Sequence, residues 1–159
     1  MITQLEGFLL TRQWRDTKNG LELSFWLSTE QGPLRLIIQG GQAVCFVRRN
    51  NEMQLPKKIQ RKPLELKSLS GDEMDGLYFR QQRDLASLRD HLNYDKTQLH
   101  ESEIKPTERY LMERFITASV CARGELIQRD GYLEMLQPQL KASDYAPSLK
   151  WVSLDIETH

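Results

Sequence analysis

The sequence predicts a mixed α+β domain in which an antiparallel sheet or partly open barrel carries a strand-helix-strand-helix insert. Two observations favour this fold class. Apolar residues alternate in short runs separated by turn signals over the first forty-odd positions, and leucines recur at helical spacing after residue 80. With 159 residues, of which 39% are apolar and 28% charged, the chain has the size of one domain with a modest core.

Four strands are predicted in the first part of the chain. The first begins near Phe8 and ends in a turn where Asn19-Gly20 supplies the positive φ of a hairpin. In the return strand, residues 21–28, leucine and phenylalanine alternate with polar residues and Trp26, so one face of this strand is buried. The third and fourth strands are residues 34–39 and 43–47, separated by Gly40-Gly41.

The middle of the chain predicts the insert. Residues 48–67 contain two prolines and show no sustained periodicity, so we expect mainly an exposed connection with a short strand near 64–69. The insert that follows has, in order, a strand, a helix, a second strand and a second helix at residues 77–80, 85–92, 98–104 and 107–116. Pro106 suits the first turn of the second helix, and Met112, Phe115 and Ile116 predict a core-facing stripe on it.

The last part of the chain predicts a hairpin, a polar connection and a final strand. Residues 125–127 pair with 132–136 across Asp130-Gly131. The final strand covers residues 149–158. We place a domain boundary in the polar connection, so that residues 1–147 form the first domain and residues 148–159 belong to a second one.

Charge is balanced overall but unevenly distributed. The chain has 22 basic and 22 acidic residues, so net charge identifies no partner. Residues 48–67 nevertheless hold seven basic and two acidic residues, a net charge of +5. Such a stretch is either a solvated loop or a contact for DNA phosphates. The candidate DNA-binding residues are Arg48, Arg49, Lys57, Lys58, Arg61 and Lys62.

Other features favour a cytoplasmic protein. No apolar run approaches the length of a membrane helix, and the first ten residues lack the pattern of a secretion signal. Cys45 and Cys121 have no CxxC spacing and read as buried thiols. Base stacking by Trp14, Trp26, Tyr78 and Phe79 is one interpretation of the aromatic residues, but core packing is favoured for Trp26 and Phe79.

Asp155 and Glu157 are the candidate metal ligands. In an extended strand they share one face, while Val152, Leu154 and Ile156 occupy the other. Two neighbouring carboxylates can hold a pair of Mg²⁺ or Mn²⁺ ions. Spacing alone does not identify such a site, since a chain with this many acidic residues contains roughly 0.7 Asp-x-Glu triplets by chance.

Several ordered blocks resemble family B DNA polymerases. Lys150 to Thr158, with its Asp-Ile-Glu core, resembles the first exonuclease motif of this family, and Glu108 to Phe115 resembles the helix that precedes it. Gly7 to Asp16, Ser24 to Leu27 and Gly76 to Tyr78 look like the amino terminus of the bacterial polymerase II branch. The resemblance spans nearly the whole chain.

This resemblance implies the amino-terminal domain of a polymerase, ending in the first strand of a truncated RNase H-like exonuclease domain. The parent would be a DNA-directed DNA polymerase with 3′ to 5′ exonuclease activity in replication and repair. Asp155 and Glu157 would be exonuclease ligands for Mg²⁺ or Mn²⁺. The expected partners are template DNA and the exonuclease and palm domains of the same chain, with no membrane. Alone, these residues are expected to hold no metal stably and to be inactive.

Two alternatives from other classes remain open at this stage. One is a free-standing module with an OB-like barrel that binds single-stranded nucleic acid tightly in isolation. The other is a small metal-dependent nuclease that uses Asp155 and Glu157.

Overall fold

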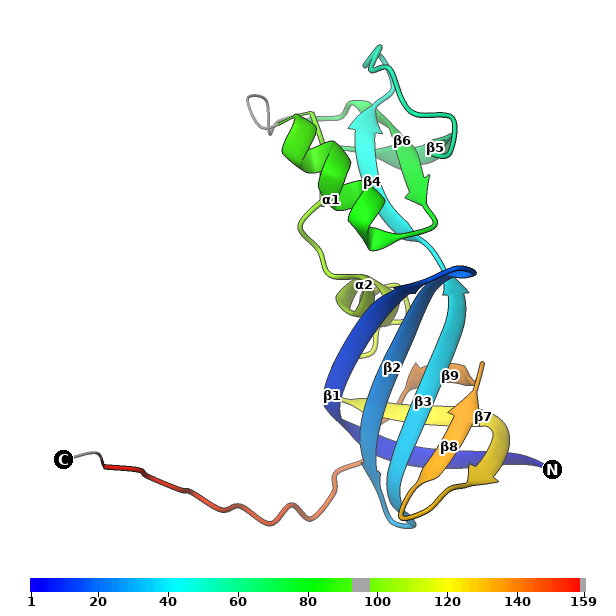
Figure 1. The fold of residues 1–159 in the computed structure, drawn as a ribbon, viewed down its shortest axis with the longest axis vertical. Helices are drawn as coiled ribbons and strands as arrows, with labels where there is room; N and C mark the ends of the chain where they lie inside the picture. Colours follow the sequence, from blue (N-terminus) through cyan, green and yellow to red (C-terminus); the bar gives the residue numbers. More distant parts are fainter. Residues whose placement is uncertain (93–97, 158–159) are drawn as a thin grey trace.

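The structure, a computed structural model, describes residues 1–92 and 98–157, and its strands form two sheets (Figure 1). The bounds of the elements are β1 Ile2–Thr17, β2 Gly20–Thr29, β3 Gly32–Gly41, β4 Ala43–Arg48, β5 Gln60–Lys67, β6 Glu73–Phe79, α1 Gln82–His91, α2 Pro106–Met112, β7 Ser119–Gln128, β8 Leu133–Leu136 and β9 Gln139–Ala142. Thr158, the last residue of the predicted final strand, and His159 lie outside the described residues.

The larger sheet closes on itself as a barrel. Its six strands follow the order β1-β2-β3-β8-β7-β9, and the first five form the barrel because β7 also pairs with β1. Strand β1 is long enough to do this because Ile2–Phe8 pairs with β7 and Gly7–Thr17 pairs with β2, with a bulge after Leu9. Strands β3 and β8 run parallel, whereas the other pairs are antiparallel. A five-stranded barrel with this order is the OB-fold arrangement. Of the two forms predicted for the sheet, an open antiparallel sheet or a partly open barrel, the structure has the barrel.

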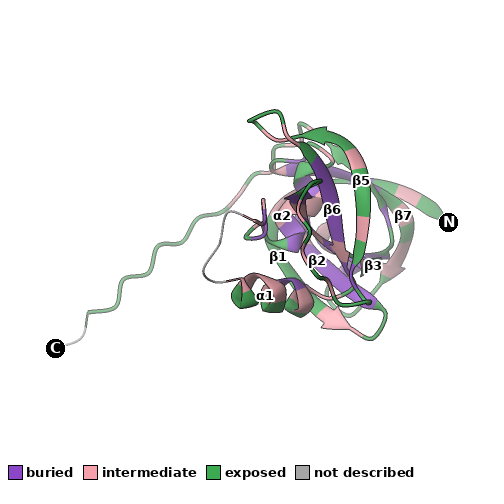
Figure 2. Cartoon of the chain, turned by 90° about the horizontal axis from the view of Figure 1, so that it is seen from above, coloured by how far each residue is buried: buried purple, intermediate pink, exposed green. Residues whose placement is uncertain are grey.

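Alternating apolar residues fill the barrel. In β2, Leu23, Phe25 and Leu27 are buried, as the pattern predicts. Helix α2 closes one end of the barrel: its Tyr110 lies against Phe25, with ring centroids 5.8 Å apart, and Leu111 is part of the same core. Figure 2 shows that buried positions concentrate along β2 and β6.

The insert between β3 and β7 has its own small sheet and core. Its strands follow the order β4-β6-β5, and α1 packs against β4 and β6. A second cluster of buried residues, including Cys45, Leu77, Phe79 and Leu85, fills the space beneath α1. The chain therefore contains two cores, with the inserted sheet above the barrel and α2 beside the junction (Figure 1).

The basic stretch and the segment after α1 differ from the prediction. The short strand expected near 64–69 is the longer β5, Gln60–Lys67, which pairs with β6 despite Pro63 because β5 is an edge strand of its sheet. The prediction of a strand at residues 98–104 is wrong. There, only His100 makes a bridge, to Phe46, because Glu101 has a φ of 58° and residues 101–104 leave the extended conformation.

The end of the described chain also differs from the prediction. Residues 143–157 contain no strand, and Val152, Leu154 and Ile156 are each more than four-fifths exposed. An extended segment becomes a strand only where a neighbouring strand accepts its hydrogen bonds, and the described residues provide none here. The segment leaves the barrel as an extended tail (Figure 1).

Helix α2 is shorter than predicted. It ends at Met112, and Phe115 has a φ of 54°, so the expected core stripe is only partly formed. Ile116 is buried, but Met112 and Phe115 are exposed.

Both cysteines are buried and unpaired, as predicted. Burial raises the pKa of the Cys45 thiol to about 12, so this group stays protonated and unreactive near neutral pH. Within the described part of the chain, no helix is long and apolar enough to cross a membrane.

Candidate nucleic-acid interface

An aromatic and arginine cluster lies on the outer face of the barrel. Trp26 in β2 sits between buried Phe25 and Leu27, so its side chain points outward. The ring of Tyr132, in the loop before β8, lies 5.1 Å from the Trp26 ring, and the Arg35 guanidinium lies 5.9 Å from it. We call Trp26, Arg35 and Tyr132 the outer-face cluster.

Strand register explains why these residues meet. Trp26 pairs with Arg35 across β2 and β3, and Arg35 pairs with Glu134 across β3 and β8. Directly paired residues point to the same face, so the three side chains form a row across the barrel. Core packing for Trp26, favoured by the sequence, is therefore only partly correct: its ring is half-buried against Tyr132 on the outside of the barrel.

Two buried carboxylates organise the arginines around this row. Glu134 accepts hydrogen bonds from Arg129 at 2.7 and 2.9 Å, and Arg35 lies 3.7 Å away. Glu22 accepts one from Arg15 at 2.6 Å, which keeps the pKa of Glu22 below its ordinary value despite the opposing effect of burial. Both glutamates are less than a tenth exposed, whereas the side chain of Arg15 remains 70% exposed.

The outer face carries a small excess of positive charge. Three arginines, Arg15, Arg35 and Arg129, pair with two buried glutamates, so these five side chains have a net charge of +1, and Arg15 and Arg129 are the more exposed of the arginines. In OB folds, the face made by the second and third strands, with the loop between the fourth and fifth, binds oligonucleotides. These elements are β2, β3 and the β7–β8 loop in this chain.

The predicted basic residues lie on the inserted sheet and mostly make ion pairs within it. Asp75, which is 6% exposed, lies 3.0 Å from the Arg49 side chain and 2.8 Å from that of Arg61. Burial opposes ionisation of Asp75, but hydrogen bonds from Arg61 and Arg49 outweigh it and lower the pKa of this carboxyl. We call Arg49, Arg61 and Asp75 the Asp75 ion cluster.

The other four candidates are more exposed. Arg48 pairs with Asp72 at 3.2 Å and Lys58 with Asp84 at 2.7 Å, while the Lys62 ammonium lies 4.9 Å from the Tyr78 ring. Lys57 is exposed. Residues 49–59 are a connection without strand or helix, as predicted, but the stretch is not a continuous free cationic surface, and its binding role stays a prediction.

The structure does not bring Asp155 and Glu157 together with further ligands. Both lie on the exposed tail, and the described residues contain no group of three or more side chains placed to hold a metal. Two-metal phosphoryl chemistry requires more ligands than two carboxylates on an extended segment can supply. The residues described here do not by themselves fit a resident metal pair.

Sequence reasoning missed Arg35, Arg129 and Tyr132. Tyr132 lies 106 positions after its partner Trp26, and no local pattern links them. The only available signal was the outward position of Trp26 in a strand whose other face is apolar.

Comparisons with known proteins show what the chain is similar to. The family model for the amino-terminal part of DNA polymerase II matches residues 7–42. The chain is 39% identical over 158 residues to DNA polymerase II of Escherichia coli (strain K12), covering 96% of this chain and 20% of that protein. Its fold matches the family B DNA polymerase of the archaeon Pyrobaculum calidifontis with a TM-score of 0.64, 10% identity, and coverage of 89% of this chain and 21% of that one.

Fold and sequence together point to one class of protein: the chain is similar to the amino-terminal part of family B DNA polymerases. Within that class, it is similar to bacterial DNA polymerase II, which confirms the resemblance seen in the sequence motifs. The chain spans about a fifth of the length of the relatives that it matches.

Proposed function

We propose that this domain holds single-stranded template DNA within a polymerase that carries out template-directed synthesis and 3′ to 5′ proofreading in bacterial replication and repair. The observation that carries this proposal is the outer-face cluster on an OB-type barrel. We place the parent enzyme in the cytoplasm, with DNA as its macromolecular substrate.

Stacking and charge would act together at this face. A base can stack on the exposed part of the Trp26 and Tyr132 rings, and this is independent of sequence because every base has an aromatic face. Arg129 and Arg15 are well exposed and would contact the phosphates on either side. Affinity from these contacts should decrease as salt increases.

The domain would also brace the proofreading site. The exposed tail carries alternating apolar residues, Val152, Leu154 and Ile156, which gain stability only when another sheet covers them. A tail paired into an exonuclease sheet would fix Asp155 and Glu157 relative to the barrel. There they would act as ligands for Mg²⁺ or Mn²⁺ in the parent enzyme, together with carboxylates from elsewhere in it.

The proposal is tested by DNA binding to the 159-residue chain. Fluorescence anisotropy with a labelled oligo(dT) should show weak, salt-sensitive binding, and Trp26→Leu should weaken it by about 5-fold or more, because stacking contributes about 1–3 kcal/mol per base. Trp151→Leu on the exposed tail is the matched control and should leave the affinity unchanged. Equal losses in both variants, or no binding at low salt, would contradict the proposal.

The two alternatives make different predictions in the same assays. A free-standing binding module would bind oligo(dT) tightly in isolation, with a steep salt dependence. The OB topology is the observation that supports this alternative. A small nuclease would digest DNA with Mg²⁺ and lose this activity in the Asp155→Ala variant. We expect no digestion by the unmodified chain or by the variant.

A further inference from the structure

Glu134 lies on the outer face of the barrel, yet its side chain is only 5% exposed. Its neighbours in β8, Leu133 and Met135, belong to the barrel core, so strand alternation turns Glu134 to the outside. A buried carboxylate is costly unless cations neutralise it. The two cations that do so, Arg35 and Arg129, are therefore held at this face.

Arg129 is held by two hydrogen bonds to one oxygen atom. Its Nε and Nη2 donate to Oε1 of Glu134 at 2.9 and 2.7 Å. Within the described part of the chain, its Nη1 has no hydrogen-bond or ion-pair partner. One edge of the planar guanidinium is thus fixed to Glu134, and N–H groups on its other side remain available to a ligand.

Arg35 is held from two sides. Its Nη1 lies 3.7 Å from Oε2 of Glu134, and its Nε donates to the Ser24 hydroxyl at 3.2 Å. Its Nη2 has no partner among the described residues. The guanidinium lies 5.9 Å from the Trp26 ring, so the unused donor is next to the aromatic surface on which a base would stack.

The turn that carries Arg129 also carries Tyr132. The Arg129 amide donates to the Tyr132 carbonyl at 2.9 Å, and the Tyr132 ring lies 5.1 Å from that of Trp26. The side chain of Glu134 binds Arg129 across the same turn. One carboxylate therefore fixes two guanidinium groups beside the two rings.

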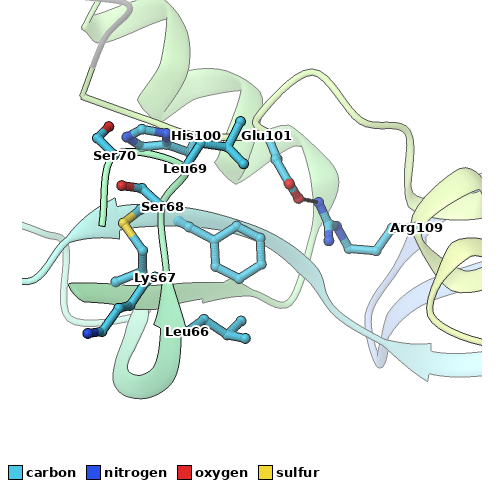
Figure 3. A pocket seen from close by; sticks show the side chains of 10 residues that line it. Leu66, Lys67, Ser68, Leu69, Ser70, His100, Glu101 and Arg109 are labelled. Carbon is cyan, nitrogen blue, oxygen red and sulfur yellow. Dashed lines mark hydrogen bonds and ion pairs between the residues drawn. The ribbon is translucent and has the colours of Figure 1, made fainter. Parts of the chain in front are cut away.

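Ion pairing alone does not leave an arginine available to DNA. At the junction of α2 with the inserted sheet, Arg109 pairs with Glu101 at 2.6 Å, but its side chain is only 13% exposed (Figure 3). The side chains of Arg35 and Arg129 are 31% and 45% exposed. Glu134 thus holds its two arginines while leaving them accessible from solvent.

The small net charge of the outer face makes the orientation of these arginines important. With a net charge of +1 over the paired side chains, a polyanion gains little from charge alone. A planar guanidinium in a fixed orientation can instead donate two parallel hydrogen bonds to phosphate oxygens. Because its orientation is already fixed, it loses less conformational entropy when the phosphate binds.

We propose that Glu134 is a positioning residue for DNA binding. It orients Arg35 and Arg129 so that their unpaired N–H groups bind the phosphates beside a base stacked on the rings of the outer-face cluster. The inference rests on the proposed function and adds to it the residue that orders the phosphate contacts. Glu134 acts through the arginines and does not itself touch the DNA.

The test compares Glu134→Gln with Asp130→Asn in the 159-residue chain, using anisotropy of labelled oligo(dT). Both variants remove one negative charge from the same hairpin, and Asp130 is exposed in its turn. Charge alone predicts that both bind DNA more tightly than the unmodified chain. If Glu134 positions the arginines, Glu134→Gln weakens binding by about 5-fold or more instead. Asp130→Asn, the matched control, should not weaken it.

Salt dependence shows whether the lost contacts are contacts to phosphates. For single strands, each phosphate contact contributes about 0.7 to the slope of log affinity against log salt concentration. We expect the slope of Glu134→Gln to be smaller by about 0.7–1.4, which corresponds to one or two lost contacts. Weaker binding with an unchanged slope would mean that the substitution only disturbs the hairpin, and would overturn the inference.

Arg129→Lys gives a second measurement, which does not depend on the folding of the Glu134 variant. Arg129 is exposed, and lysine keeps its charge but not its planar fork. We expect Arg129→Lys to weaken oligo(dT) binding nearly as much as Arg129→Gln does. Full affinity in Arg129→Lys would show that charge alone is sufficient, and the inference would be wrong.

The outcomes separate this inference from the proposed function. If Trp26→Leu weakens oligo(dT) binding but Glu134→Gln strengthens it or leaves it unchanged, the inference is overturned and the proposed function stands. If the unmodified chain does not bind oligo(dT) at low salt, the proposed function fails and the inference fails with it. Circular dichroism of each variant checks that the fold is retained.

Discussion

Asp75 connects three parts of the inserted sheet through two arginines. It lies in β6, whereas Arg49 follows β4 and Arg61 lies in β5, so one carboxylate ties three chain segments together. Arg61 also donates to the backbone carbonyls of Asn51 and Arg49, at 2.7 and 3.0 Å. The Asp75 ion cluster is therefore a structural feature of the segment that the sequence predicts to be mainly an exposed connection.

Asp75→Asn should destabilise the chain. The amide keeps the shape of the side chain but removes the charge that Arg49 and Arg61 share, and hydrogen bonds to charged groups contribute about 1.5–3 kcal/mol. We expect a loss of that size in the free energy of unfolding, measured by urea denaturation. Glu65→Gln, an exposed residue of β5, is the control and should change it by less than about 0.5 kcal/mol.

The same cluster predicts how stability depends on pH. The pKa of Asp75 is lower in the folded chain than in the unfolded one, so the unfolded state takes up protons first as pH falls. Its contribution is fully present above the unfolded pKa, about 4, and is lost as pH falls through the folded value. Urea midpoints measured from pH 7 to pH 3 should decrease less steeply in Asp75→Asn than in the unmodified chain. Parallel curves would contradict this.

The sequence predicted single residues well only where local periodicity determines their environment. Leu23, Phe25 and Leu27 are buried because strand alternation leaves no other face for them. Arg49 and Arg61 looked like free cations because their acidic partner is 26 and 14 positions away, respectively. The outer-face cluster escaped prediction for a similar reason, since Trp26 and Arg35 meet through sheet register and Tyr132 joins them from a loop distant in the sequence.

At the scale of elements, the end of α2 shows how backbone conformation limits a helical pattern. The Ile116 amide donates to the Leu111 carbonyl and the Phe115 amide to that of Met112, both at 3.0 Å. With Phe115 at positive φ, this is the Schellman ending of a helix, a position usually taken by glycine. The pattern of apolar residues continues to Ile116, but the helix has already ended.

Phe115→Gly should stabilise the chain. Phe115 is 87% exposed, so little burial is lost, and glycine removes the steric cost of the left-handed conformation, about 1 kcal/mol. We expect the free energy of unfolding to rise by about 0.5–1 kcal/mol in urea denaturation. Met112→Gly, inside the same helix, should have the opposite sign, because glycine costs about 1 kcal/mol there. A decrease in both variants would refute this account of the helix end.

Some strands depend on partners more than on their own sequence. The hairpin across Asp130-Gly131 was predicted correctly because its turn chemistry is local, and Gly131 has the positive φ that the turn requires. Strand β9 was missed because its residues are mostly exposed and polar, and it is a strand only by pairing with β7. The tail has the stronger strand pattern but no neighbour among the described residues, so it forms none.

At the scale of the whole molecule, Arg109 joins the two cores. It belongs to α2, which closes the barrel, but its guanidinium packs on Phe46 of the inserted sheet and pairs with Glu101. The proposed strand-holding face belongs to the barrel, whereas the inserted sheet has its own core, so their relative position depends on this junction.

The tail should contribute nothing to the stability of the rest of the molecule. Ser143 and Tyr145 are tied to the barrel, since the Ser143 side chain donates to Glu6 at 2.7 Å and the Ser119 hydroxyl donates to the Tyr145 carbonyl. Beyond residue 147, the described chain is exposed, or nearly so, along its length. Deleting residues 148–159 should therefore leave the urea midpoint unchanged, measured by circular dichroism because the deletion removes Trp151.

A longer deletion provides the control. Removing residues 143–159 also removes the contacts of Ser143 and Tyr145, including the Ser143 amide that donates to the Ser119 carbonyl at 3.1 Å. Each such hydrogen bond contributes about 0.5–1.5 kcal/mol, so this variant should be measurably less stable. If the shorter deletion destabilises the chain as much as the longer one, the tail packs on the barrel in solution. Its apolar face would then be unavailable to the exonuclease sheet that the proposed function assigns to it.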